Sequence, residues 1–183
     1  AISLAGLIGL LATSQHLIDR NGKPIGTDFS NVYAAGVLTL SGKAPDAYDP
    51  ALQHAAEIAV FEGRDVPFFG WHYPPFFLMI AALLALMPYA LALLCWLAVS
   101  LPAFMAAVHA IVPRRETWLG TAAFPAVFVN IGHGQNAFFT AALLGGFLTL
   151  LNPRPVLAGV LLGLLSYKPQ FGVLIPLVLL VTG

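Results

Sequence analysis

Charged side chains are confined to a small part of this 183-residue chain, which restricts what it can fold into. Eleven of its sixteen Lys, Arg, Asp and Glu residues lie between Asp19 and Asp65. None occurs from residue 66 to 113 or from 117 to 153, and each stretch is far longer than the roughly 20 residues that one membrane-spanning helix needs. We therefore predict an integral membrane protein with one polar insert folded at the bilayer surface.

Composition supports a membrane environment and excludes several other classes. The chain is 59% hydrophobic and 9% charged, whereas a typical soluble domain is about 25% charged. A net charge of zero without a basic tail makes nucleic acid an unsuitable partner. The single Cys95 cannot form an internal disulfide and is interpreted as a small core residue. No spacing of His, Asp and Glu is typical of a metal site, so neither a metal nor another cofactor is expected.

The apolar segments predict an all-α, polytopic transmembrane helical bundle made of one domain, residues 1–183. Residues 1–18 are its first span, and 19–72 form its first loop, which the family resemblance described below places outside the cytoplasm. About six further hydrophobic segments occupy 73–183, some of them below the length of a full crossing. Their expected ranges are 74–87, 89–112, 117–131, 137–151, 156–165 and 171–181. Because the sequence begins and stops at apolar runs, we expect an amino-terminal fragment.

The sidedness of the later segments is open. If the insert lies outside the cytoplasm, counting spans also puts Arg114 and Arg115 outside, against the tendency of Lys and Arg to stay cytoplasmic. One segment would then be re-entrant or half-length. The sides on which Gly132 to Asn136 and Lys168 lie are therefore left undecided.

Within the insert, two short helices are predicted. Asp28–Leu40 carries an apolar stripe and has Thr27 or Asp28 as its expected N-cap. Ala51–Phe61 is the second, and both are expected to lie at the membrane interface with their apolar sides down. Three acidic residues of this region are expected to form a solvated face: Glu57, Glu62 and Asp65.

Several short motifs occur in a fixed order along the chain. They are Gly26-Thr27-Asp28-Phe29-Ser30-Asn31-Val32-Tyr33, Tyr48-Asp49-Pro50, Tyr73-Pro74-Pro75, Gly134-Gln135-Asn136 and Lys168-Pro169. In order and spacing they resemble glycosyltransferase family 87, which includes bacterial mannosyltransferases that depend on polyprenyl-phosphate mannose. The resemblance covers nearly the whole chain, but only the amino-terminal half of a usual member.

This resemblance implies a helical bundle in the plasma (inner) membrane with its active site on the extracytoplasmic side. It implies transfer of a mannose-like hexose from a polyprenyl phosphate to a lipid or glycan acceptor hydroxyl, with inversion. The bilayer, the lipid-linked sugar and the acceptor are the implied partners. In the family the first loop carries the catalytic aspartate, and Asp28 is the matching position.

These residue types suit that chemistry. A carboxylate is needed to take the proton of a weakly nucleophilic hydroxyl, which Asp28 can do. The departing phosphate gains negative charge, which cations and N–H donors stabilise. The candidate substrate-binding residues are Tyr33, Asp49, Arg64, His72, Tyr73, His133, Gln135, Asn136 and Lys168.

Each candidate also has a structural interpretation. Asp28 can be a helix cap, Asp49 a turn former, His133 part of a helix break, and Lys168 a side chain that reaches the interface. For the whole chain, a secondary transporter and a non-catalytic assembly subunit are the alternatives to a transferase.

Overall fold

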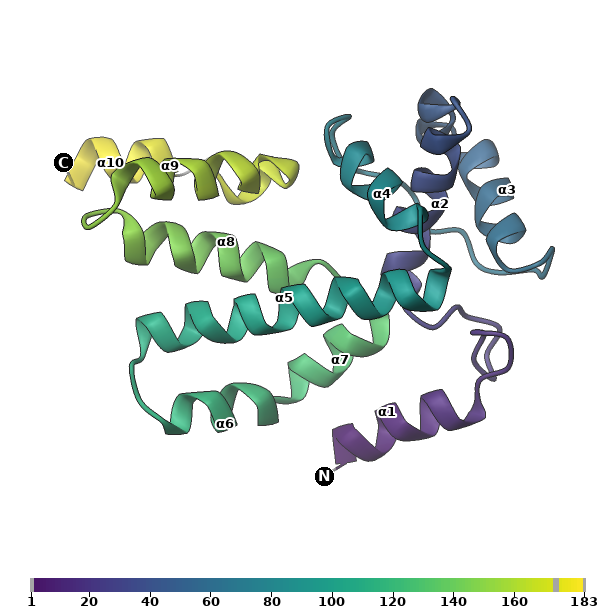
Figure 1. The fold of residues 1–183 in the computed structure, drawn as a ribbon, viewed down its shortest axis with the longest axis horizontal. Helices are drawn as coiled ribbons and strands as arrows, with labels where there is room; N and C mark the ends of the chain where they lie inside the picture. The colour runs from purple at the N-terminus through teal and green to yellow at the C-terminus, as the bar shows by residue number, and fades with distance from the viewer. Residues whose placement is uncertain (1, 173–174, 183) are drawn as a thin grey trace. The chain divides into compact units, whose positions relative to one another are not determined.

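The computed structural model describes residues 2–172 and 175–182, and every regular element in those ranges is a helix. The prediction of an all-α chain is confirmed (Figure 1). The α-helices are α1 (Ile2–Thr13), α2 (Thr27–Leu40), α3 (Pro50–Val60), α4 (Phe77–Ala85), α5 (Tyr89–Ile111), α6 (Glu116–Ala123), α7 (Pro125–His133), α8 (Ala137–Leu150), α9 (Pro155–Leu164) and α10 (Ile175–Thr182). The short 3-10 helices are η1 (Ala44–Tyr48), η2 (Leu165–Tyr167) and η3 (Pro169–Phe171).

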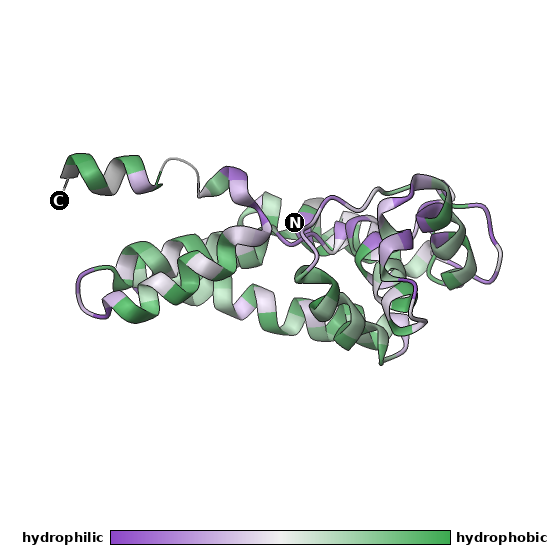
Figure 2. Ribbon diagram, turned by 90° about the horizontal axis from the view of Figure 1, so that it is seen from above, coloured by the Kyte–Doolittle hydropathy of each residue, from purple (hydrophilic) through white to green (hydrophobic). Residues whose placement is uncertain are grey.

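One helix in the described part of the chain, α5, is long and apolar enough to cross a bilayer. Shorter apolar helices cover Leu4–Thr13, Ala137–Leu150 and Pro155–Tyr167. Hydrophobic residues dominate the longer helices, whereas hydrophilic positions concentrate in the insert and the loops (Figure 2). The polytopic bundle therefore stays a prediction, with α5 as its clearest span.

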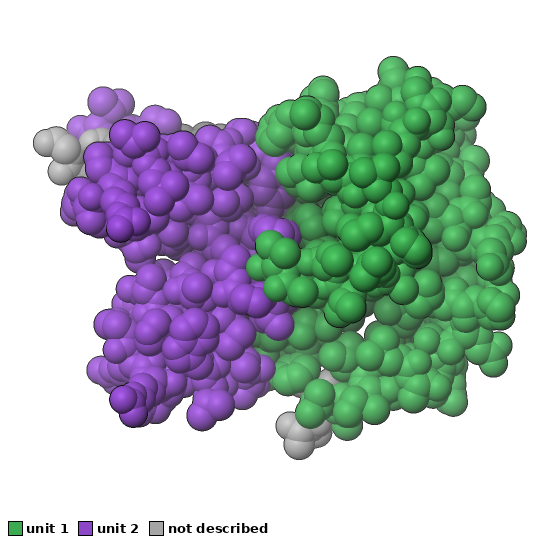
Figure 3. All heavy atoms as spheres, in the orientation of Figure 1, with its two compact units in different colours: residues 1–99, 124–136 green, residues 100–123, 137–183 purple. Residues whose placement is uncertain are grey.

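The chain divides into two compact units (Figure 3). Unit 1 contains residues 1–99 and 124–136, and unit 2 contains 100–123 and 137–183. Unit 1 therefore holds the whole polar insert together with α7 and the first half of α5.

In unit 1, α2 is a central packing helix. It contacts α4 on one side and α3 and η1 on the other. Eight of its residues are buried, including the polar Ser30 and Asn31. A Cβ added at Gly36 would overlap the Ala81 carbonyl, so α2 and α4 pack backbone against backbone. The interfacial position of α2 stays a prediction.

Unit 2 is held by contacts among its own helices. α8 packs along α9, and Thr140 and Tyr167 share a buried hydrogen bond of 2.7 Å between their hydroxyls. The rings of Phe104 and Phe138 stack with centroids 5.3 Å apart.

The two insert helices match their predicted ranges to within one residue, but two apolar segments differ. The first helix ends at Thr13 rather than at residue 18, because Gln15 and Ile18 exchange backbone hydrogen bonds of 2.8 and 3.0 Å in a tight turn. The segment predicted over 117–131 is broken into α6 and α7, where Pro125 starts α7 at a position that needs no N–H.

Glu57 is buried instead of lying on the predicted solvated face, which the exposed Glu62 and Asp65 do join. Its side chain is 0% exposed, and its Oε2 accepts a 3.0 Å hydrogen bond from the Phe69 amide. Among the described residues, Oε1 has no hydrogen-bond partner. Burial raises the pKa of Glu57 to about 7, although the Phe69 amide and His54 oppose the shift.

This burial predicts a pH-dependent stability. In the unfolded chain the Glu57 carboxyl has its usual pKa of 4.5 and is deprotonated above it. In the folded chain the same carboxyl stays protonated up to about pH 7. The contribution of Glu57 is therefore complete below pH 4.5 and is lost as pH rises to 7, by roughly 2 to 3 kcal/mol. Thermal unfolding of the full chain in neutral detergent across this range measures it. Glu57→Gln should flatten the slope, whereas the exposed Glu62→Gln should keep it; a slope unchanged by Glu57→Gln contradicts the prediction.

Candidate active site

The carboxyl end of α7 and the amino end of α2 meet in unit 1. The Gly26 amide donates a 3.1 Å hydrogen bond to the Gly132 carbonyl. Gly26 lies in the left-handed region with φ 75° and is the N-cap of α2, so the predicted cap at Thr27 or Asp28 is wrong. The Gly26 carbonyl accepts from the amides of Phe29 and Ser30, each at 2.9 Å. Helix α2 therefore begins at a glycine N-cap, and no side chain caps its first amides.

Gly134 makes the close approach possible from the other side. It also lies in the left-handed region, with φ 61°. A Cβ added there would lie 2.8 Å from both Leu93 Cδ1 and Phe29 Cβ, and 3.3 Å from Gly26 Cα. Glycine is therefore required both by backbone conformation and by space.

Two aromatic residues of α5 fix both sides of this junction. The Tyr89 hydroxyl donates to the Ile25 carbonyl at 2.7 Å, and Trp96 Nε1 donates to the Gly134 carbonyl at 3.0 Å. Both side chains are buried. They attach the start of α2 and the end of α7 to the same helix.

Asp28, the predicted catalytic residue, lies in the first turn of α2 and is half-buried. Its carboxylate caps nothing and makes no hydrogen bond within the described residues. The partial positive charge at a helix amino terminus stabilises a carboxylate at this position. Asp28 is thus held in place by its backbone while its side chain is available for chemistry.

Tyr73 and Asn136 lie in the same neighbourhood. Asn136 is buried, and its Nδ2 donates a 2.7 Å hydrogen bond to the Tyr73 hydroxyl. Burial raises the pKa of Tyr73, and the nearby negative charge of Asp28 adds to this effect, while the bond from Asn136 opposes it. The Tyr73 carbonyl accepts from the Tyr48 hydroxyl at 3.0 Å. The structure therefore brings three predicted site residues together: Asp28, Tyr73 and Asn136.

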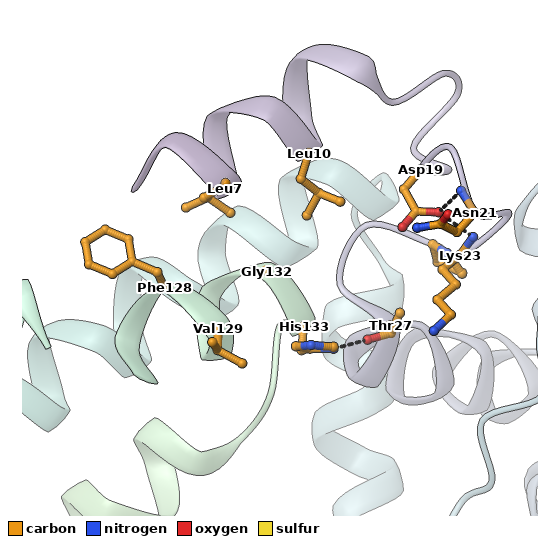
Figure 4. Close-up of a pocket in the computed structure, with 12 residues that line it drawn as sticks. Leu7, Leu10, Asp19, Asn21, Lys23, Thr27, Phe128, Val129, Gly132 and His133 are labelled. Carbon is orange, nitrogen blue, oxygen red and sulfur yellow. Dashed lines mark hydrogen bonds between the residues drawn. The ribbon is translucent and has the colours of Figure 1, made fainter. Parts of the chain in front are cut away.

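His133, at the end of α7, reaches the turn that contains Asp28. Its Nδ1 and Thr27 Oγ1 are 2.6 Å apart and share a hydrogen bond. Both residues line a cavity of about 400 Å³ between α1, α7 and the start of the insert (Figure 4).

The cavity has an apolar wall and a polar one. The apolar part is lined by Leu7 and Leu10 of α1 and by Phe128 and Val129 of α7. The polar part is lined by Asp19, Asn21, Lys23, Thr27 and His133. Asp19 Oδ1 accepts from the amides of Asn21 and Lys23, both at 2.8 Å, which folds this turn over the cavity.

Two predicted substrate-binding residues have scaffold contacts instead. The Tyr33 hydroxyl donates to the Met87 carbonyl at 2.7 Å and so links α2 to the start of α5. Asp49 is the N-cap of α3, where its Oδ1 accepts from the amides of Ala51 and Leu52. For Asp49 these contacts agree with its structural interpretation, whereas the structural role of Tyr33 was not predicted.

The remaining candidates are spread along the chain. Arg64 is half-buried, with its Nη2 3.9 Å from Glu62 Oε2. His72 and Gln135 are exposed. Lys168 belongs to unit 2, where its Nζ lies 6.0 Å from the centroid of the Phe171 ring.

The sequence analysis missed Lys23, Asp19 and the role of Thr27. Thr27 precedes Asp28 in a quoted motif, but capping was the only role assigned to it. Nothing in the sequence distinguishes Lys23 from an ordinary loop lysine. In the described ranges, no group of three or more His, Cys, Asp or Glu residues is arranged to hold a metal ion.

A comparison with known proteins identifies the family of the chain. The family model of glycosyltransferase family 87 matches residues 71–183. No curated protein and no solved structure matches the chain. The matched range contains Tyr73, His133 and Asn136.

The glycine junction gives a prediction. Gly134→Ala should lower the stability of unit 1 by about 1 to 3 kcal/mol, because the added methyl group collides with Leu93 and Phe29 in a backbone conformation that favours glycine. Thermal unfolding in neutral detergent measures the change. Gly159→Ala is the matched control, since an added Cβ there meets no atom within 4 Å; equal melting temperatures for the two variants would show that the junction is not tight.

Proposed function

The chain belongs to glycosyltransferase family 87, and from this we propose an integral membrane enzyme that acts on a lipid-linked sugar. In this proposal a mannose-like hexose moves from a polyprenyl-phosphate donor to a hydroxyl of a lipid or glycan acceptor, with inversion. Glycosyl transfer follows from the family, while the donor, the acceptor and the stereochemistry are parts of the proposal.

The membrane location draws on the family and on α5. Members of the family are generally membrane proteins, and α5 is long and apolar enough to cross a bilayer. We place the enzyme in the plasma membrane as a multi-pass protein with its active site on the extracytoplasmic side. The concentration of eleven charged residues in one insert supports a single folded polar surface.

One observation carries the mechanism: Asp28 lies at the junction of α2 and α7 with a carboxylate that caps nothing. In the proposed step, Asp28 accepts the proton of the acceptor hydroxyl while that oxygen attacks the anomeric carbon. The bond from this carbon to the phosphate oxygen breaks, and the polyprenyl phosphate leaves with the bonding electrons. Attack opposite the leaving group gives the inverted product.

Tyr73 and Asn136 suit the binding of a sugar next to this base. Asn136 fixes the Tyr73 hydroxyl by a 2.7 Å hydrogen bond. The Tyr73 ring packs against Trp71 and Phe77, with centroids 5.0 and 4.8 Å away. Such a held aromatic ring with a polar edge can contact both the face and the hydroxyls of a hexose.

The cavity between α1 and α7 suits the donor lipid. Its apolar wall, which includes Leu7 and Phe128, suits contact with the first isoprene units of a polyprenol. Lys23 and His133 in its polar wall suit binding of the phosphate. Preorganised positive charge stabilises the leaving phosphate as its charge grows. The proposal includes no metal or other cofactor.

Replacing the base tests this function. Asp28→Asn in the full chain should lower transfer of labelled sugar from a polyprenyl-phosphate donor by about 10² to 10⁴-fold, the usual contribution of a positioned base. Asp65→Asn, an exposed carboxylate of the same insert, should keep wild-type activity. Activity per mole of folded protein is measured in membranes of both variants. Wild-type turnover by Asp28→Asn would remove this residue from the mechanism.

A further inference from the structure

A second cavity lies next to the first one at the end of α1. Its volume is about 550 Å³, and both cavities include Asp19 in their walls. Ser14, Gln15, Arg20 and Arg64 contribute its polar lining. All these residues belong to unit 1. The donor site proposed above does not use this cavity.

The positive charges of the insert gather at these two cavities. Between Asp19 and Asp65 the chain has seven acidic residues and four basic ones. Three of the four basic residues line the cavities: Lys23 the first, Arg20 and Arg64 the second. Cations therefore collect at one place in a segment whose net charge is negative.

Neither arginine is neutralised by a close ion pair. Within the described residues, no carboxylate lies within 4.0 Å of Arg20. Arg64 has one contact, 3.9 Å from Nη2 to Glu62 Oε2, and both side chains are partly open to solvent. Such a long, exposed pair contributes little. Both guanidinium groups are thus available to an anion.

Strained backbone surrounds the same cavity. In the described ranges, the non-glycine residues with positive φ are His16, Leu17 and Glu62. His16 and Leu17 form the turn between Gln15 and Ile18, and Glu62 turns the chain two residues before Arg64. His16 Nδ1 and Glu62 Oε2 are 3.7 Å apart, so the two turns meet. Strain of this kind concentrates at functional sites, where it sets side-chain positions.

The cavity lies at the polar end of an apolar helix. The exposed side chains Leu4, Ile8 and Leu11 make the surface of α1 apolar, and polar residues begin at Thr13. If α1 is in the bilayer, its carboxyl end lies at the level of the lipid headgroups. Arginine at this depth meets lipid phosphates, which it binds through two parallel N–H donors.

We propose that this cavity binds the phosphate of an anionic membrane lipid through Arg20 and Arg64. The further claim that this lipid is the acceptor, or carries it, rests on the proposed transferase function. Because the cavity shares Asp19 with the donor cavity, a lipid held there brings its headgroup next to the donor. The ligand class is a phosphodiester lipid with a net negative charge.

A binding measurement tests the site without requiring turnover. Dioctanoyl phosphatidylglycerol is titrated into the full chain in neutral-detergent micelles by calorimetry. The double variant Arg20→Gln, Arg64→Gln should raise the dissociation constant about tenfold or more, as expected for lost charge-assisted hydrogen bonds. Lys43→Gln removes the insert's remaining cation, which lines neither cavity, and should leave binding unchanged. Glu62→Gln should tighten binding, because it removes the carboxylate next to Arg64.

The outcomes separate the possibilities. An unchanged dissociation constant in the double variant overturns the site. If Lys43→Gln weakens lipid binding as much as the double variant does, the lipid is attracted only by the general charge of the insert, which also overturns the site. Inorganic phosphate that binds as tightly as the lipid would make the ligand a free anion and overturn the lipid assignment. Sugar transfer is tested by Asp28→Asn and lipid binding by the arginine variants, so failure of the transferase proposal and failure of the lipid site are read separately. If the double variant does not fold, the Glu62→Gln variant still tests the site: tighter lipid binding supports it, and unchanged binding contradicts it.

Discussion

The hydrogen bond from the Gly26 amide to the Gly132 carbonyl joins two segments that are far apart in the sequence, and the candidate site is arranged around it. It brings the positive end of α2, which carries Asp28, next to the negative end of α7, which carries His133. The approach is possible because Gly26 and Gly134 lack side chains where Phe29 and Leu93 leave no room. Tyr89 and Trp96 then fix both sides of the junction to α5, so a long apolar helix positions the polar part.

Capping by glycine has a chemical consequence. An aspartate that caps a helix has one oxygen occupied by backbone amides, as Asp49 does at the start of α3. Asp28, two residues after the N-cap of α2, keeps its oxygens free while the helix charge still acts on it. The two aspartates were equally open to a structural interpretation from the sequence. Their different positions relative to the N-cap now separate a scaffold residue from a candidate base.

Local patterns predicted much of this fold, and long-range contacts account for what they missed. The helical stripes gave α2 and α3 to within one residue, and motif spacing predicted Asp28, Tyr73 and Asn136 as site residues, which the structure places near one another. Their roles stay predictions. Burial of Glu57 could not be predicted, because it depends on how Phe69 folds back over α3. The early end of α1 and the second cavity depend on turns at Leu17 and Glu62 that their residue types disfavour. Sequence patterns give no sign of strain that tertiary contacts maintain.

The short first helix links the two cavities. If α1 continued to residue 18, as its apolar sequence suggests, the Gln15–Ile18 turn could not form and Asp19 would not fold back between the cavities. With its end at Thr13, α1 supplies Leu7 and Leu10 to the apolar wall of the first cavity and Ser14 and Gln15 to the polar lining of the second. At a rise of about 1.5 Å per residue, Leu7 in the first cavity and Thr13 in the second are separated by roughly 9 Å along α1. One element thus sets the relative depths of an apolar wall and a polar lining, which suits the proposed pair of a lipid-linked donor and an anionic lipid.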